Sequence, residues 1–341
     1  MDTNRAGLNS MLDIFFTEAR AEWTEAMNAA KENMILGKIA MQVQSKTNQT
    51  RHAWLKQLPA MRKWVGDRKV NNLSSQTLNI VNDKFENTIE LTREEFEDDQ
   101  YGLYLPLFGI MGRQAMATKD RMLSDAILYG TTGTWGGDDV VVFTSSLRTY
   151  GSATINNTQS TAFDSLGAAL TAAIKLQQSY LGHNGQPMMV RSKVLLYGPN
   201  LYDVVHKAVK NSFSALATGG TTTHVGGDNF QGNNPSNPNK DIVELVPSEY
   251  FVDGYVDLDG NTYSHAGKKY ALIGEAMGVR AGLIYQSRLE PELQDQRAKF
   301  DSAADVVFLS DKLQWGVRMR GKAFIGLPHL IFLGDATAYG S

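Results

Sequence analysis

Residues 54–104 read WLKQLPAMRKWVGDRKVNNLSSQTLNIVNDKFENTIELTREEFEDDQYGLY, and they constrain the architecture more strongly than any other segment. The segment starts with Trp54 and Trp64 set among five cations, without the spacing of a helix or a strand. Charged side chains are seldom buried without a partner, so this mixture is unusual for the core of one subunit. We therefore expect residues 54–69 to contact a neighbouring subunit.

Two alternating segments follow this basic stretch. Leu78 and Ile80 lie on one side of residues 76–81, and the alternation returns in residues 85–91 after a turn-like Asn82-Asp83-Lys84. This pattern predicts a β-hairpin. Because an isolated two-stranded hairpin is at best marginally stable in water, we expect it to lie on other parts of the protein or on a neighbouring subunit.

A helix start follows the predicted hairpin directly. Thr92 and Glu95 have the spacing of a capping box, which predicts that a helix begins here. Pro106 should break or kink this helix, and a second apolar stripe carries it on to Gly130. We therefore predict one long, kinked helix over residues 93–128.

The N-terminal part is predicted to form an arm. Apolar residues recur every three or four positions from Leu8 to Ala30, which predicts an amphipathic helix that needs a partner to pack against. Polar residues dominate 42–51, which is typical of an extended link.

A compact α/β pattern begins at residue 161 and predicts a second domain. Helices are expected at 163–180 and 201–209, on either side of a strand at 193–197. Gly, Thr, Asn and Pro dominate residues 218–240, so this part is predicted to be a long loop that cannot fold alone. Further strands are expected at 242–246, 270–274, 305–309, 313–320, 324–325 and 330–333.

Composition narrows the classes of function. The chain has 341 residues, of which 42% are hydrophobic, enough for a sizeable core and about two domains. Its formal net charge of -3 argues against tight binding of nucleic acid through many Lys and Arg contacts. There is no cysteine, no apolar run of membrane-spanning length and no signal-peptide pattern, so we expect a cytoplasmic chain without disulfides or membrane contact.

No catalytic, cofactor-binding or metal-binding motif has supporting context, so we do not expect an enzyme. Asp257, Asp259 and Gly260 resemble the start of a calcium loop, but Lys268 stands where that loop needs a carboxylate, and a turn between strands is favoured. The six histidines show no paired spacing.

The acidic residues after position 93 could form a cation site or act as acid/base carboxylates. They lie at the predicted helix start, where the helix dipole favours negative charge, so a structural role is favoured. They also lie close in sequence to the basic stretch, and the two sets supply complementary charge for joining identical subunits. The candidate inter-subunit contacts are Trp54, Arg62, Lys63, Trp64, Arg68, Lys69, Glu94, Glu95, Glu97, Asp98 and Asp99.

Ordered segments along most of the chain resemble the major head subunit family of Mu-like prophages. These segments are AWL at 53–55, MRKWVGDR at 61–68, KFE at 84–86, EDDQYGLY at 97–104, LYGPNLYD at 196–203, the loop at 229–235, QSR at 286–288 and WGVRMRG at 315–321. The resemblance implies an α+β chain with the Hong Kong 97-like phage capsid fold. That fold consists of an N-terminal arm, an extended β-hairpin loop, a peripheral domain with a long spine helix, and an axial domain.

The resemblance also implies where these parts lie. The expected boundaries are 1–53 for the arm, 54–91 for the extended loop, 92–160 for the spine helix and first peripheral strands, 161–274 for the axial domain, and 275–341 for the return strands of the peripheral domain.

The function implied is that of a major capsid protein whose pentamers and hexamers close an icosahedral head around double-stranded DNA. Expected partners are further copies of the chain, a scaffold, a maturation protease, a portal, and DNA held without sequence-specific binding. The chain would assemble in the host cytoplasm and end in the virion. An encapsulin-like compartment and a soluble hydrolase with an unrecognised site are the alternatives.

Overall fold

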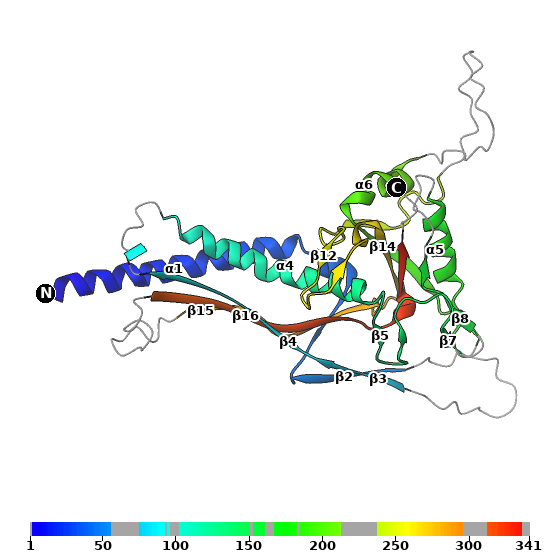
Figure 1. The fold of residues 1–341 in the computed structure, drawn as a ribbon, viewed down its shortest axis with the longest axis horizontal. Coiled ribbons are helices and arrows are strands. Elements are labelled where there is room, and N and C mark those ends of the chain that lie inside the picture. Colours follow the sequence, from blue (N-terminus) through cyan, green and yellow to red (C-terminus); the bar gives the residue numbers. More distant parts are fainter. Residues whose placement is uncertain are drawn as a thin grey trace, which may run out of the picture.

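The computed structural model describes residues 2–55, 75–92, 94–95, 102–150, 153–160, 167–182, 185–212, 237–295 and 312–335. Within these ranges a long limb of helices and strands leads into a broader body built on a second sheet, and a thin ribbon of two strands lies beside the limb (Figure 1). No helix in these ranges is both long and apolar enough to span a membrane.

The limb is built on a four-stranded sheet in the order β1-β15-β16-β4. These strands are β1 (Met41–Gln44), β15 (Leu283–Asp295), β16 (Lys312–Ile325) and β4 (Asp83–Thr92). β16 pairs antiparallel with both β15 and β4, whereas β1 lies parallel to β15. Burial alternates along much of β16, so one face of the sheet is apolar and needs a cover.

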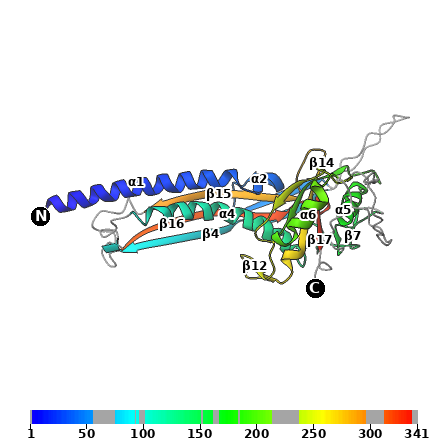
Figure 2. The same cartoon turned by 90° about the horizontal axis from the view of Figure 1, so that it is seen from above.

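Two helices, α1 (Asp2–Glu32) and α4 (Leu105–Tyr129), provide that cover (Figure 2). Trp315 of β16 is 1% exposed, and its ring centroid lies 5.8 Å from that of Phe15 on α1 and 5.3 Å from that of Phe108 on α4. The helices approach closely at Gly112, where an added Cβ atom would lie 2.7 Å from the carbonyl oxygen of Trp23. The predicted amphipathic helix and its need for a partner are confirmed.

The body is built on a five-stranded sheet in the order β11-β10-β14-β17-β9. Its strands are β11 (Glu244–Pro247), β10 (Val190–Tyr197), β14 (Lys269–Ala276), β17 (Ile331–Asp335) and β9 (Thr158–Gln159). Helices α5 (Ala168–Gln178) and α6 (Tyr202–Lys210) share an apolar cluster with Leu195, Tyr197 and Leu272 of this sheet.

Shorter elements connect these layers. The short helices are α2 (Leu36–Ile39), η1 (Pro199–Leu201), η2 (Ala266–Lys268) and η4 (Pro328–Leu330). The two-stranded pairs are β2 (Gln49–Leu55) with β3 (Ser75–Val81), β5 (Thr134–Trp135) with β6 (Val140–Val141), β7 (Arg148–Tyr150) with β8 (Ala153–Ile155), and β12 (Tyr255–Val256) with β13 (Thr262–Tyr263).

The predicted hairpin is wrong in its pairing, although both of its strands exist. β3 pairs antiparallel with β2, and β4 pairs antiparallel with β16. Only Asn82 lies between β3 and β4, so the chain crosses there from the ribbon into the limb, and the turn-like Asp83 and Lys84 already belong to β4. The polar link expected at 42–51 is also wrong, because β1 and the start of β2 occupy most of it.

The long, kinked helix is wrong as well. α4 begins at Leu105, with Pro106 in its first turn, and Gly102 and Leu103 before it are not helical. Proline is favoured in a first helical turn because the backbone N–H that it lacks would have no partner there. Pro106 therefore lies at the start of α4, whereas the sequence predicted that it would break or kink a longer helix.

The C-terminal strands divide between the two sheets. β16 is a single strand that joins the segments expected at 313–320 and 324–325, whereas β17 pairs with β14 in the body. Residues 275–341 therefore contribute strands to both sheets, and their assignment to the peripheral domain stays a prediction. The strand expected at 305–309 and the loop residues 218–236 lie outside the described residues.

Candidate assembly surfaces

The ribbon of β2 and β3 is the first candidate surface. Its strands pair from Gln49 opposite Val81 to Leu55 opposite Ser75, and neither strand belongs to a larger sheet. Leu78 is 4% exposed and belongs to a core cluster that α4 and β16 share, so the ribbon rests on the limb.

Polar contacts fix the base of this ribbon. His52 Nε2 lies 2.6 Å from Gln286 Oε1, and Gln286 Nε2 donates to Asn82 Oδ1 at 2.7 Å. The Asn82 amide nitrogen also donates to the carbonyl oxygens of Thr47 and Asn48, both at 3.1 Å. The ribbon is therefore tied to β15 at its base.

Most of the predicted contact residues of this ribbon lie beyond that base. Trp54 is on β2, where it pairs with Gln76 across the ribbon. Arg62, Lys63, Trp64, Arg68 and Lys69 lie outside the described residues. Their contacts with a second subunit stay a prediction.

The acidic helix start is the second candidate surface. The backbone N–H of Thr92 donates to Glu95 Oε2 at 2.9 Å, and the backbone N–H of Glu95 donates to Thr92 Oγ1 at 3.3 Å, so the capping box is confirmed. The bond from the Thr92 backbone is the main reason that the pKa of Glu95 lies below its ordinary value. Glu94 and Glu95 are exposed. Glu97, Asp98 and Asp99 lie outside the described residues.

The aspartate-rich segment between β12 and β13 is a turn closed by its own hydrogen bonds. Asp257 Oδ1 accepts the backbone N–H groups of Asp259 and Asn261 at 3.0 and 2.7 Å, and Oδ2 accepts the Tyr263 hydroxyl at 3.0 Å. In the described part of the chain, no group of His, Cys, Asp or Glu side chains could hold a metal ion. The favoured reading, a turn between strands, is therefore confirmed.

Two carboxylates of α4 hold neighbouring elements against the helix. Asp120 accepts the backbone N–H groups of Ile35 and Leu36 at 3.1 and 3.0 Å, which fixes the start of α2. Burial raises the pKa of Asp120 to about 6, against the opposing effect of these bonds. The sequence gives no sign of this role, because a single Asp on a helix has no distinctive spacing.

Asp125 holds the β12–β13 turn in the same way. Its Oδ1 accepts the Tyr255 hydroxyl at 2.6 Å, and its Oδ2 accepts the backbone N–H of Leu258 at 3.2 Å. Arg121 Nη2 adds a bond to the carbonyl oxygen of Val256 at 2.9 Å. Burial raises the pKa of Asp125 to about 6. The β12–β13 hairpin is thus fastened to α4 at several points.

A groove of about 640 Å³ lies between the ribbon, α4, β16 and this hairpin. Apolar side chains, among them Leu78, Met122 and Trp135, form much of its lining, and Asp125 and Asp259 lie on its acidic side. It is a gap between these packed elements.

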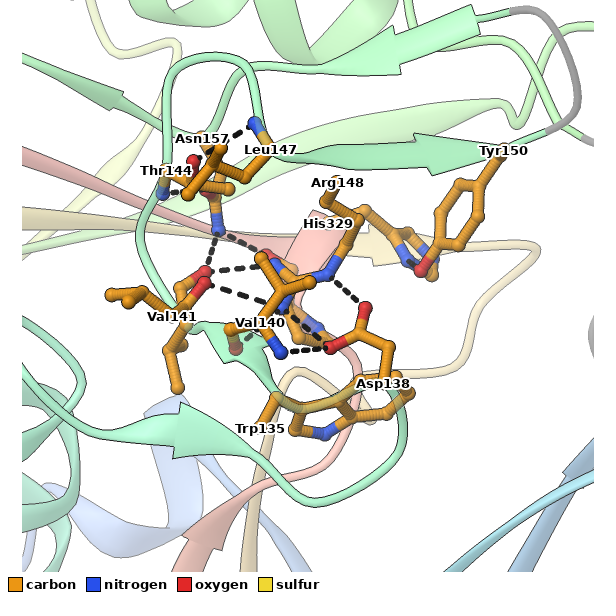
Figure 3. Close-up of polar contacts among 12 residues, drawn as sticks. Trp135, Asp138, Val140, Val141, Thr144, Leu147, Arg148, Tyr150, Asn157 and His329 are labelled. Carbon is orange, nitrogen blue, oxygen red and sulfur yellow. Dashed lines mark hydrogen bonds and ion pairs between the residues drawn. The ribbon is translucent and has the colours of Figure 1, made fainter.

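A buried arginine holds together the joint formed by residues 135–148, which follow α4. Arg148 of β7 is 1% exposed, its Nε donates to Asp138 Oδ2 at 2.7 Å, and its Nη1 donates to the carbonyl oxygen of Val142 at 2.8 Å (Figure 3). Its guanidinium also lies 5.6 Å from the ring centroid of Trp135, whose Nε1 donates to the carbonyl oxygen of Ile325 at the end of β16.

Asn157 completes this joint. Its amide nitrogen donates to the carbonyl oxygens of Val142 and Pro328 at 2.9 and 3.0 Å, and its Oδ1 accepts the backbone N–H of Thr144 at 2.9 Å. Next to it lies the buried His329, and this burial lowers the pKa of its ring from the ordinary range to about 3, so the ring is neutral. These polar groups connect the loops after α4 with the strand that enters the body.

Comparisons with known proteins concern the family and the fold of the chain. The family model described as Mu-like prophage major head subunit gpT matches residues 12–161. The major capsid protein of Escherichia phage Mu is 37% identical over 95 residues, which are 28% of this chain and 31% of that protein. The Mu-like prophage FluMu major head subunit of Haemophilus influenzae is 38% identical over 92 residues, 27% of this chain and 30% of that protein. The chain thus aligns with about a third of the length of these curated relatives.

Solved structures extend the likeness to most of the chain. The mature capsid of bacteriophage PhiM1 matches with a TM-score of 0.51 at 11% identity, over 87% of this chain and 84% of that one. The capsid of cyanophage P-SCSP1u matches with a TM-score of 0.50 at 14% identity, over 87% and 85%. The chain has the Hong Kong 97-like phage capsid fold.

The sequence-based resemblance to the Mu-like head subunit family and the α+β capsid fold are thereby confirmed. Within this capsid fold the structure brings Thr92, Glu94 and Glu95 together at one helix start, as predicted. The residues that reasoning from the sequence missed are those that join elements of the capsid fold to each other: Asp120, Asp125, Arg148, Asn157 and Gln286.

Proposed function

We propose that the chain is the major capsid protein of a Mu-like tailed phage or prophage. Its copies form pentamers and hexamers, which close an icosahedral head around double-stranded DNA. The observation that carries this proposal is the capsid fold over most of the chain, with a two-stranded ribbon that no larger sheet supports. Such a ribbon gains most from lying across another copy.

The parts of the fold take the roles that the family resemblance implied. The arm is α1, α4 is the spine helix of the peripheral domain, and the extended loop is the ribbon of β2 and β3 with residues 56–74 between its strands. The five-stranded body is the axial domain, completed by β17 from the C-terminal part.

The contacts that we propose between copies join the basic tip of the ribbon to the acidic helix start. The cations at 62, 63, 68 and 69 would face Glu94 and Glu95 of a neighbour, together with the acidic residues at 97–99, while Trp54 and Trp64 add apolar area. Each exposed ion pair contributes at most about 1 kcal/mol, but the contacts repeat around the whole shell.

The remaining partners follow from this role. A scaffold, a maturation protease and a portal would act with the chain during assembly in the host cytoplasm, and the finished shell would be part of the virion. The net charge of -3 suits a wall that encloses DNA without binding it tightly.

Electron microscopy of the purified full-length chain tests this proposal. Closed icosahedral particles are expected, and particles formed in infected or induced cells should contain DNA. A stable monomer or dimer under all assembly conditions would contradict it, and particles that hold an enzyme cargo would instead indicate an encapsulin-like compartment.

A variant of the basic residues tests the proposed contact between the ribbon tip and the acidic helix start. Changing Arg62, Lys63, Arg68 and Lys69 together to Glu should leave a folded subunit that no longer assembles, since like charges would then meet at each joint. Shells of this variant at the wild-type yield would contradict the pairing but not the proposed function.

A further inference from the structure

Two exposed methionines have an unusual backbone conformation. Met189 and Met277 have φ angles of +53° and +52°, in the left-handed region where a Cβ atom is strained and Gly or Asn is usual. They immediately precede and follow the paired residues Val190 and Ala276, at the end of the β10–β14 ladder. Their side chains are 61% and 78% exposed. A strained backbone that presents an apolar side chain to solvent indicates that the side chain is held ready for a contact.

These methionines lie in an apolar and basic surface, which we call the methionine flank. Val279, 48% exposed, is bonded to Ala276 in the turn that contains Met277. Arg191, two residues after Met189, is exposed. Lys193 and Arg280 lie 3.1 and 3.6 Å from the two carboxylate oxygens of Glu275. Three cations around one carboxylate leave this flank positive.

A surface of opposite charge lies on the other side of the body, and we call it the acidic flank. It consists of the β12–β13 hairpin and its surroundings, where Val256 and Leu258 are 46% and 38% exposed. Glu249, Asp253 and Asp259 around them are exposed. Because Asp125 and Arg121 fasten the hairpin to α4, its apolar side chains are held in place.

The two flanks face in opposite directions. Arg280 Nη1 donates to the carbonyl oxygen of Lys38 in α2 at 2.8 Å, which places the methionine flank beside that helix. In Figure 2, α2 lies along one edge of the molecule and β12 along the opposite edge.

We propose that the methionine flank of one copy docks on the acidic flank of the next copy, head to tail, so that the copies close into a ring. This rests on the proposed function and names the surfaces that would join subunits within one ring. Two different surfaces on opposite sides of a subunit generate a ring when the rotation closes. Docking of either flank on its own kind is disfavoured, because like charges would meet.

A charge-swap experiment tests this docking. Arg191→Glu and Asp259→Lys would each place like charges at every joint of the ring, and we expect each to lower the yield of closed shells about tenfold. The variant that carries both changes places opposite charges at each joint again, and its yield should return to within about twofold of the wild type. Sedimentation and electron microscopy measure the yield, and thermal unfolding of unassembled subunits checks that each variant folds.

The outcomes separate this inference from the proposed function. If both single variants assemble at the wild-type yield, or if the double variant does not recover, the docking is wrong while the shell function stands. If the wild-type chain forms no shells, the proposed function itself is wrong.

The strained methionines give an independent test. The double variant Met189→Asn/Met277→Asn places asparagine, which tolerates the left-handed conformation, at both positions. The thermal midpoint of the unassembled subunit should therefore rise by about 2–4 °C, while the yield of shells should fall about tenfold because the apolar contacts are lost. The matched control is Asp139→Asn, at an exposed residue with φ of +57° in the β5–β6 turn, which should keep the wild-type yield. Wild-type yield from the methionine variant would overturn the proposal.

Discussion

Replacing Arg148 by methionine should destabilise the subunit strongly. The change keeps an unbranched apolar stem but removes bonds to both oxygens of Asp138 and to the carbonyl oxygens of Val140, Val141 and Val142. Asp138 is only 20% exposed, so its charge would stay largely buried without a cation. Removing one partner of a buried ion pair costs about 3–5 kcal/mol.

Urea unfolding of unassembled subunits, followed by tryptophan fluorescence, measures this loss. With a slope of about 3 kcal/mol per molar urea, the midpoint should fall by about 1–1.7 M. The matched control is Lys210→Met, which removes a 2.7 Å ion pair between Lys210 and Asp241. The side chains of these two residues are 54% and 56% exposed. Such a pair contributes at most about 1 kcal/mol. If Arg148→Met unfolds at the same urea concentration as this control, the buried ion pair of Arg148 and Asp138 does not stabilise the subunit as its geometry indicates.

Two further predictions concern the packing of the limb and the charge of Asp120. Gly112→Ala should destabilise the subunit by about 1–3 kcal/mol, because the added Cβ atom would lie 2.7 Å from the Trp23 carbonyl oxygen. The control Gly37→Ala should not destabilise it, because no atom lies within 4 Å of a Cβ atom added there. Equal urea midpoints for the two variants would contradict the close approach of α1 and α4. Because burial raises the pKa of Asp120 to about 6, above its value in the unfolded chain, its favourable contribution is complete at low pH and is lost as the pH rises through about 6. Between about pH 4.5 and 6.5 the free energy of unfolding should therefore fall less in Asp120→Asn than in the wild type, and parallel pH profiles would contradict this.

Local sequence patterns predicted local structure well. The three-and-four spacing located α1, and the pair Thr92 and Glu95 located a helix start, because both depend on residues a few positions apart. Strand pairing depends on distant residues, so the alternation in residues 76–91 identified two strands without identifying their partners. β4 pairs with β16, which lies more than two hundred positions away.

β15 was missed for a different reason. Pro291 interrupts its sequence, and a proline inside a strand lacks the N–H that a ladder needs. In the structure the register between β15 and β16 shifts between Leu289 and Glu292, so Pro291 lies in an irregular part of the pair. Arg148 could not be recognised from the sequence either, because the carbonyl groups that it binds come together only in the fold.

The limb contacts the ribbon on one side and the body at its end, and these two contacts differ in strength. The difference decides which contact can move during assembly. Detaching the ribbon would expose Leu78, at about 1.5–3 kcal/mol, and break a few neutral hydrogen bonds around His52 and Gln286, at about 1 kcal/mol each. A ribbon lying on a neighbouring copy could regain similar contacts there. Moving the body against the limb would open the buried apolar cluster that Leu123 of α4 and Met319 of β16 share with Ile273 of β14, and each apolar side chain exposed would cost about 1.5–3 kcal/mol. If the shell rearranges as it matures, we therefore expect the ribbon to change position and the packing between limb and body to stay intact.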